Sequence, residues 1–217
     1  MIKAAVFDLD GTICNTIDDL AESTNYALSV CGYPLHTVDE YKYFVGNGIP
    51  KLIYRAVPAD KRSAPELERA KNIMLRHYAT HYADKSRPYG GILELLDYLK
   101  KSNIRLAVCT NKADNMAKVI VEKLFADTFE IVIGQSQARP LKPNASSVNE
   151  IMQKLEVSAG ETVFIGDSEV DMQTAVNAGT HSIGAAWGFR TVEELNKNGA
   201  EYIAYTPLEV IKLIKNM

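Results

Sequence analysis

The nine residues Ala4-Ala5-Val6-Phe7-Asp8-Leu9-Asp10-Gly11-Thr12 carry the clearest structural signal in this chain. Four apolar residues, typical of a short buried strand, lead directly into two aspartates and a glycine turn. Residues at i and i+2 of an extended segment point to the same face, so Asp8 and Asp10 present their carboxylates side by side. Like charges held this close are unfavourable, which predicts a nearby cation or a catalytic task.

Short apolar or β-branched runs recur along the rest of the chain, at residues 104–109, 131–133, 162–165 and 181–185. Helix-like stretches at 112–125 and 145–155 lie between them. Strands that alternate with helices predict βαβ units and a parallel sheet. We therefore expect an α/β fold with a Rossmann-like parallel sheet core.

Residues 15–87 interrupt this alternation. They contain no clear strand, and apolar side chains recur there at a spacing of three to four residues, which indicates helices. We expect an all-helical cap domain over 15–87, inserted after the first strand of a core domain formed by 1–14 and 88–217. Glycine and proline cluster in Arg87-Pro88-Tyr89-Gly90-Gly91, so one hinge is expected there and the other near Cys14-Asn15.

Polar residues follow each of three predicted strands, where an open parallel sheet binds its ligands. A lysine in the segment Arg139-Pro140-Leu141-Lys142-Pro143 adds a cation before a predicted helix. Four separate segments thus deliver polar groups to one edge of the sheet: Asp8 and Asp10; Thr110, Asn111 and Lys112; Lys142; and Asp167, Ser168 and Asp171. Their convergence predicts an active site.

The order of these motifs resembles the phosphatase branch of the haloacid dehalogenase superfamily. The resemblance spans nearly the whole chain and implies a phosphatase acting through an aspartyl-phosphate intermediate. Asp8 would be the nucleophile, and Asp10 would protonate the leaving oxygen and later activate water. The Thr110 hydroxyl and the backbone donors of Asn111 would hold the phosphoryl oxygens together with Lys142.

The resemblance also implies a Mg²⁺ ion, held by the carboxylates of Asp8 and Asp167 and by the backbone carbonyl of Asp10. Two unit charges 4 Å apart repel by about 4 kcal/mol at an effective dielectric of 20, so a phosphate dianion beside two aspartates needs a divalent cation. Oxygen-rich sites suit magnesium. Asp171 would lie behind this first set of ligands or reach Lys142, and Ser168 to Asp171 also has the pattern of a helix capping box.

The predicted cap carries the clues to the substrate. The loop Phe44-Val45-Gly46-Asn47-Gly48, followed by Leu52 and Arg55, resembles the cap of phosphoglycolate phosphatases. Glycines at 46 and 48 let a loop approach a small ligand closely, so Gly46, Asn47 and Gly48 are candidate specificity residues. Arg55 or Lys51 is a candidate partner for a substrate carboxylate, although the Arg55 stem could instead serve packing.

Several alternatives remain open at this point. A β-phosphoglucomutase-like isomerase or a pyrophosphatase would use the same residues, and a phosphate-binding regulatory module with vestigial catalysis is a candidate from a different class. A dehalogenase is disfavoured because those relatives lack the second aspartate, here Asp10. A binding module is disfavoured because it has no need of Asp10.

Composition excludes several other roles. The formal net charge of −3 offers no basic field for nucleic acid, and no apolar run approaches the length of a membrane span. The sequence reaches Asp8 too soon for a signal peptide, and the three cysteines show no metal-type spacing. We expect a cytoplasmic monomer or homodimer acting on a small phosphorylated metabolite, with Cys14 either packed or, less simply, sensitive to oxidants.

Overall fold

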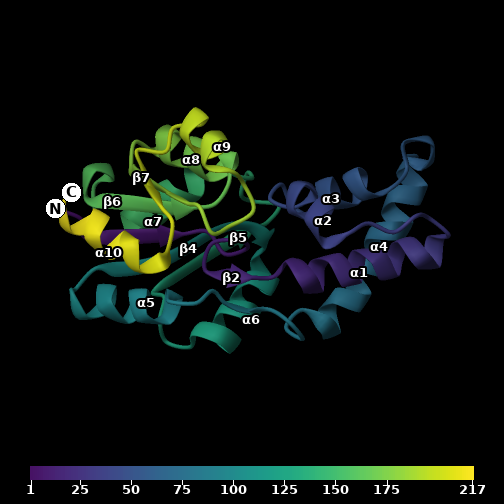
Figure 1. The fold of residues 1–217 in the computed structure, drawn as a ribbon, viewed down its shortest axis with the longest axis horizontal. Helices are drawn as coiled ribbons and strands as arrows, with labels where there is room; N and C mark the ends of the chain where they lie inside the picture. The colour runs from purple at the N-terminus through teal and green to yellow at the C-terminus, as the bar shows by residue number, and fades with distance from the viewer.

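A parallel sheet of six strands forms the centre of the larger half of the molecule (Figure 1). The computed structural model describes all 217 residues. Every neighbouring pair of strands in this sheet is parallel. The predicted α/β fold is therefore confirmed. In sheet order the strands are β5 (Ile131–Gln135), β4 (Arg105–Ala113), β1 (Ala4–Phe7), β6 (Thr162–Gly166), β7 (His181–Ala185) and β8 (Tyr202–Ala204).

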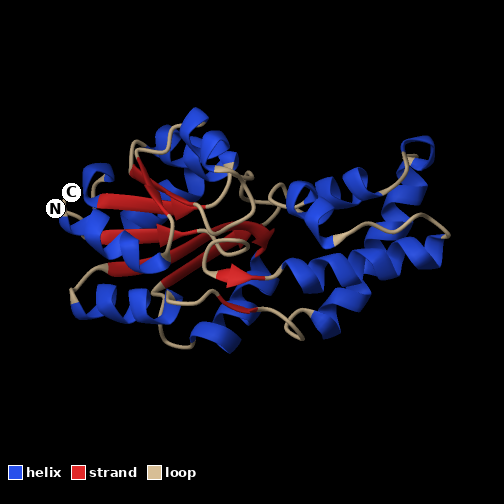
Figure 2. Cartoon of the chain, in the orientation of Figure 1, coloured by secondary structure: helices blue, strands red, loops and turns tan.

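Helices cover both faces of this sheet (Figure 2). The first face packs against α5 (Ile92–Lys101), α6 (Asp114–Phe125) and α10 (Pro207–Lys215). The second packs against α7 (Ser146–Lys154) and α8 (Glu169–Ala178). The remaining helical elements of this half are α9 (Val192–Lys197) and the short 3₁₀ turn η2 (Ala159–Glu161).

Strand β1 lies in the middle of the sheet, and all four of its residues are fully buried. Ala5 and Phe7 belong to the apolar cluster on one face, whereas Ala4 and Val6 belong to the cluster on the other. This alternation is the period-two geometry of a strand covered on both sides. Phe7 is in register with Val108 of β4 and with Ile165 of β6, and β4 alone continues well past this level, to Ala113. Asp8 therefore emerges at the same edge as the ends of its two neighbours.

The segment 17–81 consists of helices and lies beside the sheet, at the end away from the two termini (Figure 1). It has an apolar cluster of its own, which includes Tyr41, Leu52 and Met74. Its helical elements are α1 (Ile17–Cys31), α2 (Val38–Phe44), α3 (Ile49–Ala56), the 3₁₀ turn η1 (Ala59–Lys61) and α4 (Ala64–His81). None of the helices in the structure is both long enough and apolar enough to cross a membrane.

A two-stranded antiparallel ribbon joins the helical segment to the sheet half. It pairs β2 (Cys14–Asn15) with β3 (Arg87–Pro88), at the two places where hinges are expected from the sequence. The chain enters the helical segment through β2 and leaves it through β3, and these are the two places where the chain passes between the halves. This geometry agrees with the expected insertion of a cap after the first strand, and the division into two domains stays a proposal.

Two details differ from the expectations. Strand β4 runs four residues beyond the predicted end at Cys109, with an irregularity in its pairing to β5 between Cys109 and Ala113. Helix α6 accordingly starts at Asp114 rather than at Lys112. The extended conformation at 110–112 matters because it aims three successive polar residues into the region of the predicted site. The chain also adds α9, β8 and α10 after the last predicted strand.

Candidate active site

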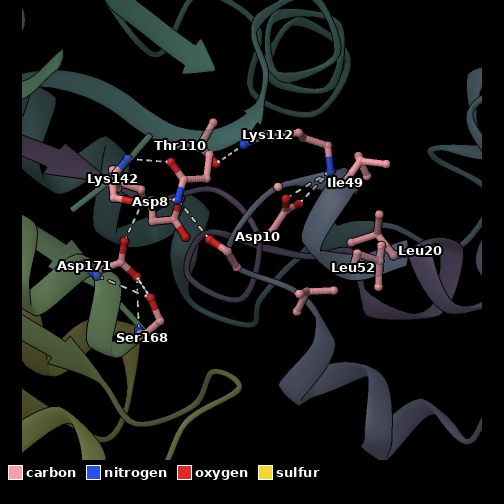
Figure 3. A pocket seen from close by; sticks show the side chains of 14 residues that line it. Asp8, Asp10, Leu20, Ile49, Leu52, Thr110, Lys112, Lys142, Ser168 and Asp171 are labelled. Atoms are coloured by element: carbon pink, nitrogen blue, oxygen red, sulfur yellow. Dashed lines mark hydrogen bonds and ion pairs between the residues drawn. The ribbon is translucent and has the colours of Figure 1, made fainter. Parts of the chain in front are cut away.

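The structure brings Asp8, Asp171 and Lys142 into direct contact at the carboxyl edge of the sheet (Figure 3). The Lys142 ammonium Nζ lies 2.8 Å from Asp8 Oδ1 and 2.6 Å from Asp171 Oδ1. Burial alone would lower the pKa of Lys142, but Asp171 and Asp8 raise it above its usual range, so the ammonium stays charged. Asn111 fixes the backbone of Lys142 by accepting from its N–H at 2.7 Å and donating to its carbonyl at 3.2 Å.

Asp167 and Asp171 are held by the turn between β6 and α8. Asp171 accepts hydrogen bonds from the N–H and the hydroxyl of Ser168, which forms the predicted capping box. Asp167 accepts from the Thr12 hydroxyl at 2.9 Å and from the Phe189 N–H at 2.8 Å. A Cβ atom at position 188 would lie 2.2 Å from the Cβ of Asp167, so only glycine fits there.

The carboxylates of Asp8, Asp167 and Asp171 fit a hard divalent cation. One oxygen from each lies within 4.8 Å of the others, and all three residues are buried. Asp8 Oδ1 is buried without a hydrogen-bond partner, and its contact with Lys142 is an ion pair. Asp171 accepts from the charged Lys142 ammonium at one oxygen and twice from Ser168 at the other, whereas each oxygen of Asp167 accepts a single neutral hydrogen bond. An oxygen-only donor set matches the preference of Mg²⁺.

The surroundings of these carboxylates oppose their negative charge. Burial raises the pKa of Asp8 to about 6, with the nearby Lys142 acting in the opposite direction. Burial, Asp171 and Asp8 raise the pKa of Asp167 well above its usual range. Without a metal the cluster therefore favours proton uptake, and a cation that binds there must displace those protons.

Asp10 lies apart from this cluster and has its own partners. Its Oδ1 accepts a hydrogen bond from the Thr16 hydroxyl at 2.6 Å. The Lys112 ammonium contacts Oδ1 at 2.9 Å and Oδ2 at 3.0 Å. Burial would lower the pKa of Lys112, but Asp10 and Tyr78 raise it above its usual range, so the ammonium stays charged. The two aspartates that are adjacent in the motif thus occupy two different electrostatic environments.

A cavity between the sheet edge and the helical segment collects most of the predicted residues. Gly46 and Gly48, in the loop between α2 and α3, reach it, and the Asn111 side chain donates to the Gly46 carbonyl at 3.0 Å. Fourteen residues line the cavity: Asp8, Asp10, Leu20, Val45, Gly46, Gly48, Ile49, Leu52, Thr110, Asn111, Lys112, Lys142, Ser168 and Asp171. The hydrogen bonds of the Asn111 side chain leave its backbone for the expected phosphate contact.

Three residues expected near the substrate do not line this cavity: Asn47, Lys51 and Arg55. Arg55 Nη1 donates to the Phe44 carbonyl at 2.9 Å, so its guanidinium braces the loop from outside. The three residues instead line a separate surface hollow beside Tyr54. The alternative considered for Arg55, a packing role, agrees better with this position.

Arg190 is a site residue that the sequence did not identify. Its side chain is only 5% exposed, and its guanidinium links the two halves of the molecule. Nε donates to Glu169 at 3.1 Å, and the other nitrogens donate to the carbonyls of Lys42 and Val45, at the end of α2. The preceding Phe189 packs into the apolar cluster of the helical segment. The strand-end segment that fixes Asp167 therefore also holds the loop above the cavity.

Comparisons with known proteins agree with this geometry. The family model described as haloacid dehalogenase-like hydrolase matches residues 5–185. The chain belongs to the haloacid dehalogenase-like hydrolase family. The phosphoglycolate phosphatase of Agrobacterium fabrum is 34% identical over 97% of this chain and 93% of that protein. The phosphoglycolate phosphatase of Chromobacterium violaceum is 32% identical over 99% of this chain and 97% of that protein.

Solved structures of this family give the same result. A predicted phosphoglycolate phosphatase from Haemophilus somnus, whose crystal structure is known, superposes with a TM-score of 0.91 at 27% identity, covering 98% of both chains. A predicted phosphatase from Clostridium acetobutylicum superposes with a TM-score of 0.88 at 25% identity over both full chains. The predicted membership of the haloacid dehalogenase-like family and the predicted class of enzyme, a hydrolase, are confirmed.

The raised pKa values predict how Mg²⁺ stabilisation depends on pH. A carboxyl whose pKa is raised in the folded state stabilises the fold when protonated, and this contribution is lost as the pH rises through about 6. A bound cation offsets that loss by replacing the protons. We expect the rise in Tm on adding Mg²⁺ to be small near about pH 5 and to grow toward about pH 7.5. A rise in Tm that is equal at both pH values, measured by calorimetry, would contradict the metal assignment.

Arg190→Gln should loosen the loop above the cavity without unfolding either half. The variant loses the ion pair with Glu169 and the donors to Lys42 and Val45, so we expect faster amide hydrogen exchange at residues 42–48. Arg139→Gln is a matched control because Arg139 pairs with Glu150 on the surface. Unchanged exchange at residues 42–48 in Arg190→Gln would show that the guanidinium does not hold this loop.

Proposed function

We propose that the protein is a magnesium-dependent phosphomonoester hydrolase that acts through an aspartyl-phosphate intermediate on a small phosphorylated metabolite, most simply 2-phosphoglycolate. The observation that carries the proposal is that the side chains of the two motif aspartates have different partners on opposite sides of the cavity. Asp8 Oδ1 has no hydrogen-bond partner and faces the Lys142 side of the cavity, while Asp10 is held on the opposite side by Thr16 and Lys112.

Asp8 is suited to the role of nucleophile. An oxygen that makes no hydrogen bond keeps its lone pairs available for attack on phosphorus, and burial keeps competing water away. The Lys142 ammonium, 2.8 Å away, orients this carboxylate and attracts the phosphoryl group. The Thr110 hydroxyl lines the same part of the cavity and supplies a donor for the transferring oxygens.

Asp10 is suited to the proton transfers. The leaving alkoxide needs a proton as its bond to phosphorus breaks, and the water that cleaves the aspartyl-phosphate must lose one. A single carboxyl group that gives the first proton and takes the second serves both steps. Thr16 and Lys112 fix the orientation of the Asp10 side chain, so its carboxyl group is already in position before the substrate binds.

Asp8, Asp167 and the backbone carbonyl of Asp10 are the groups proposed to hold Mg²⁺, with Asp171 and Ser168 supporting them through Lys142. When bound, this ion neutralises the negative charge that gathers between the carboxylates and the phosphoryl oxygens. Thr12 and the Phe189 N–H orient Asp167 toward the cluster. Both of these hydrogen bonds leave lone pairs on the carboxylate oxygens for the ion.

The helical segment 15–87 is proposed to act as a cap that closes the cavity and selects the substrate. Its apolar residues Leu20, Ile49 and Leu52 line the side of the cavity away from Asp8. Such a wall excludes bulk water, which protects the intermediate and strengthens the polar contacts inside. Support for 2-phosphoglycolate comes from relatives over nearly the full chain that are named phosphoglycolate phosphatase.

Asp8→Asn should abolish hydrolysis while leaving the fold intact. An amide at this position does not act as the nucleophile, so we expect phosphate release to fall by at least about 10³-fold. Asp60→Asn is a matched control, because the Asp60 side chain is 74% exposed on the helical segment. The assay is Mg²⁺-dependent phosphate release from 2-phosphoglycolate, pyrophosphate, sugar phosphates and nucleotides.

The outcomes of this assay separate the candidate functions. Turnover that persists in Asp8→Asn would overturn the nucleophile assignment. A dominant rate with pyrophosphate would favour the pyrophosphatase, and conversion of glucose 1-phosphate to glucose 6-phosphate would favour the mutase. Negligible wild-type rates on every substrate would favour the phosphate-binding module.

A further inference from the structure

Lys112 orients Asp10 in the proposed chemistry, and its position in the cavity also allows a contact with the substrate. It is the last of the three polar residues at the end of β4, and its side chain is only 4% exposed. Figure 3 shows its ammonium between Asp10 and the residues that the helical segment contributes, with Ile49 beside it. A buried lysine is costly to desolvate, so its presence inside a cavity calls for an anionic partner.

The two cations of the cavity lie on opposite sides of it. Lys142 contacts Asp8 and Asp171, where the phosphoryl group would bind, whereas Lys112 contacts Asp10. Because Asp10 is proposed to protonate the leaving oxygen, the remainder of the leaving group must lie beyond it, toward the helical segment. Lys112 is thus the cation nearest to the part of the substrate that distinguishes one phosphate ester from another.

The wall of the cavity on this side offers little else to a polar group. The helical segment contributes only apolar side chains and glycines to the lining: Leu20, Val45, Gly46, Gly48, Ile49 and Leu52. No side chain in this set donates or accepts a hydrogen bond. A neutral polyol would lose hydrogen bonds to water against such a wall, whereas a single charged group beside Lys112 would keep a strong partner.

The ammonium of Lys112 also has donor capacity to spare. It carries three N–H donors, and its hydrogen bonds go to the two oxygens of one carboxylate, that of Asp10. On another side the ring of Tyr78 lies 5.1 Å from Nζ, and the buried Tyr78 hydroxyl has no hydrogen-bond partner of its own. The third donor of Lys112 is thus available either to the Tyr78 hydroxyl beside it or to an anionic ligand in the cavity.

We propose that Lys112 is a specificity-determining residue that binds an anionic group on the leaving alcohol. The expected substrates are small phosphomonoesters whose alcohol carries a carboxylate within a few bonds of the ester oxygen. This inference rests on the proposed phosphatase function and deepens it. It gives Lys112 the role that the sequence suggests for Arg55 or Lys51, neither of which lines the cavity.

The test compares two substrates of nearly equal size. In 2-phosphoglycolate the group next to the ester carbon is a carboxylate, and in 2-hydroxyethyl phosphate it is a neutral hydroxymethyl group. Lys112→Met keeps the length and apolar stem of the side chain but removes its charge. We expect the ratio of kcat/KM for 2-phosphoglycolate to that for 2-hydroxyethyl phosphate to fall by about 10- to 100-fold in this variant.

The main rival explanation is that Lys112 only positions Asp10. In that case both substrates lose activity by the same factor in Lys112→Met and the ratio stays constant, which would overturn the proposal. Lys112→Arg retains the charge and should keep most of the wild-type ratio. Lys118→Met is the matched control, because Lys118 lies at 57% exposure on α6 and pairs with Asp114.

A binding measurement separates failure of this inference from failure of the proposed function. Titration calorimetry with Asp8→Asn, in the presence of Mg²⁺, gives Kd for both esters without turnover. We expect 2-phosphoglycolate to bind more tightly, and Lys112→Met in this background to remove the preference. If wild-type protein hydrolyses neither ester, the proposed function fails, but the Kd ratio still tests Lys112. Equal Kd values for the two esters, or no binding of either, would overturn the carboxylate contact.

Discussion

The structure of the site depends on one buried ammonium group that is shared by carboxylates. Lys142 lies within 2.8 Å of both Asp8 and Asp171, while Asp167 completes a cluster with more negative than positive charge. Each uncompensated pair of charges near 4 Å costs about 4 kcal/mol at an effective dielectric of 20. The fold supports this arrangement with the central position of β1, the amide of Asn111 and the glycine at 188. A cation that binds here therefore relieves electrostatic repulsion between carboxylates that the fold already holds close together.

The same constraint explains why the site is assembled from distant segments. The carboxyl ends of β1, β4 and β6 meet at one edge because their registers align, which brings Asp8, Thr110 and Asp167 together. The segment after β7 then reaches over this edge. Its backbone fixes Asp167 through Phe189, and Arg190 holds the loop that carries Gly46. The same short segment thus makes both the contact that orients Asp167 and the contact that positions the helical segment.

The members of the charged cluster lie together in the structure, and the sequence predicts this convergence because each member is set by local pattern and topology. A buried strand followed by Asp8, and another followed by Asp167, must converge if the sheet is parallel. The substrate-facing residues were less predictable. The direction of Arg55 depends on how α3 packs, and Lys112 faces the cavity because β4 continues past its apolar run. Arg190 meets residues about 145 positions away, a contact that no local pattern encodes.

The central claim is that Asp8 carries the phosphoryl group between the two halves of the reaction. The most direct measurement traps this intermediate in Asp10→Asn with p-nitrophenyl phosphate, whose leaving group needs no proton, so that formation outpaces hydrolysis. Borohydride reduces an aspartyl phosphate to homoserine, which peptide mass spectrometry locates. The account predicts homoserine at position 8 and at no other aspartate. Reduction at a different residue, or turnover with no trapped residue, would contradict it.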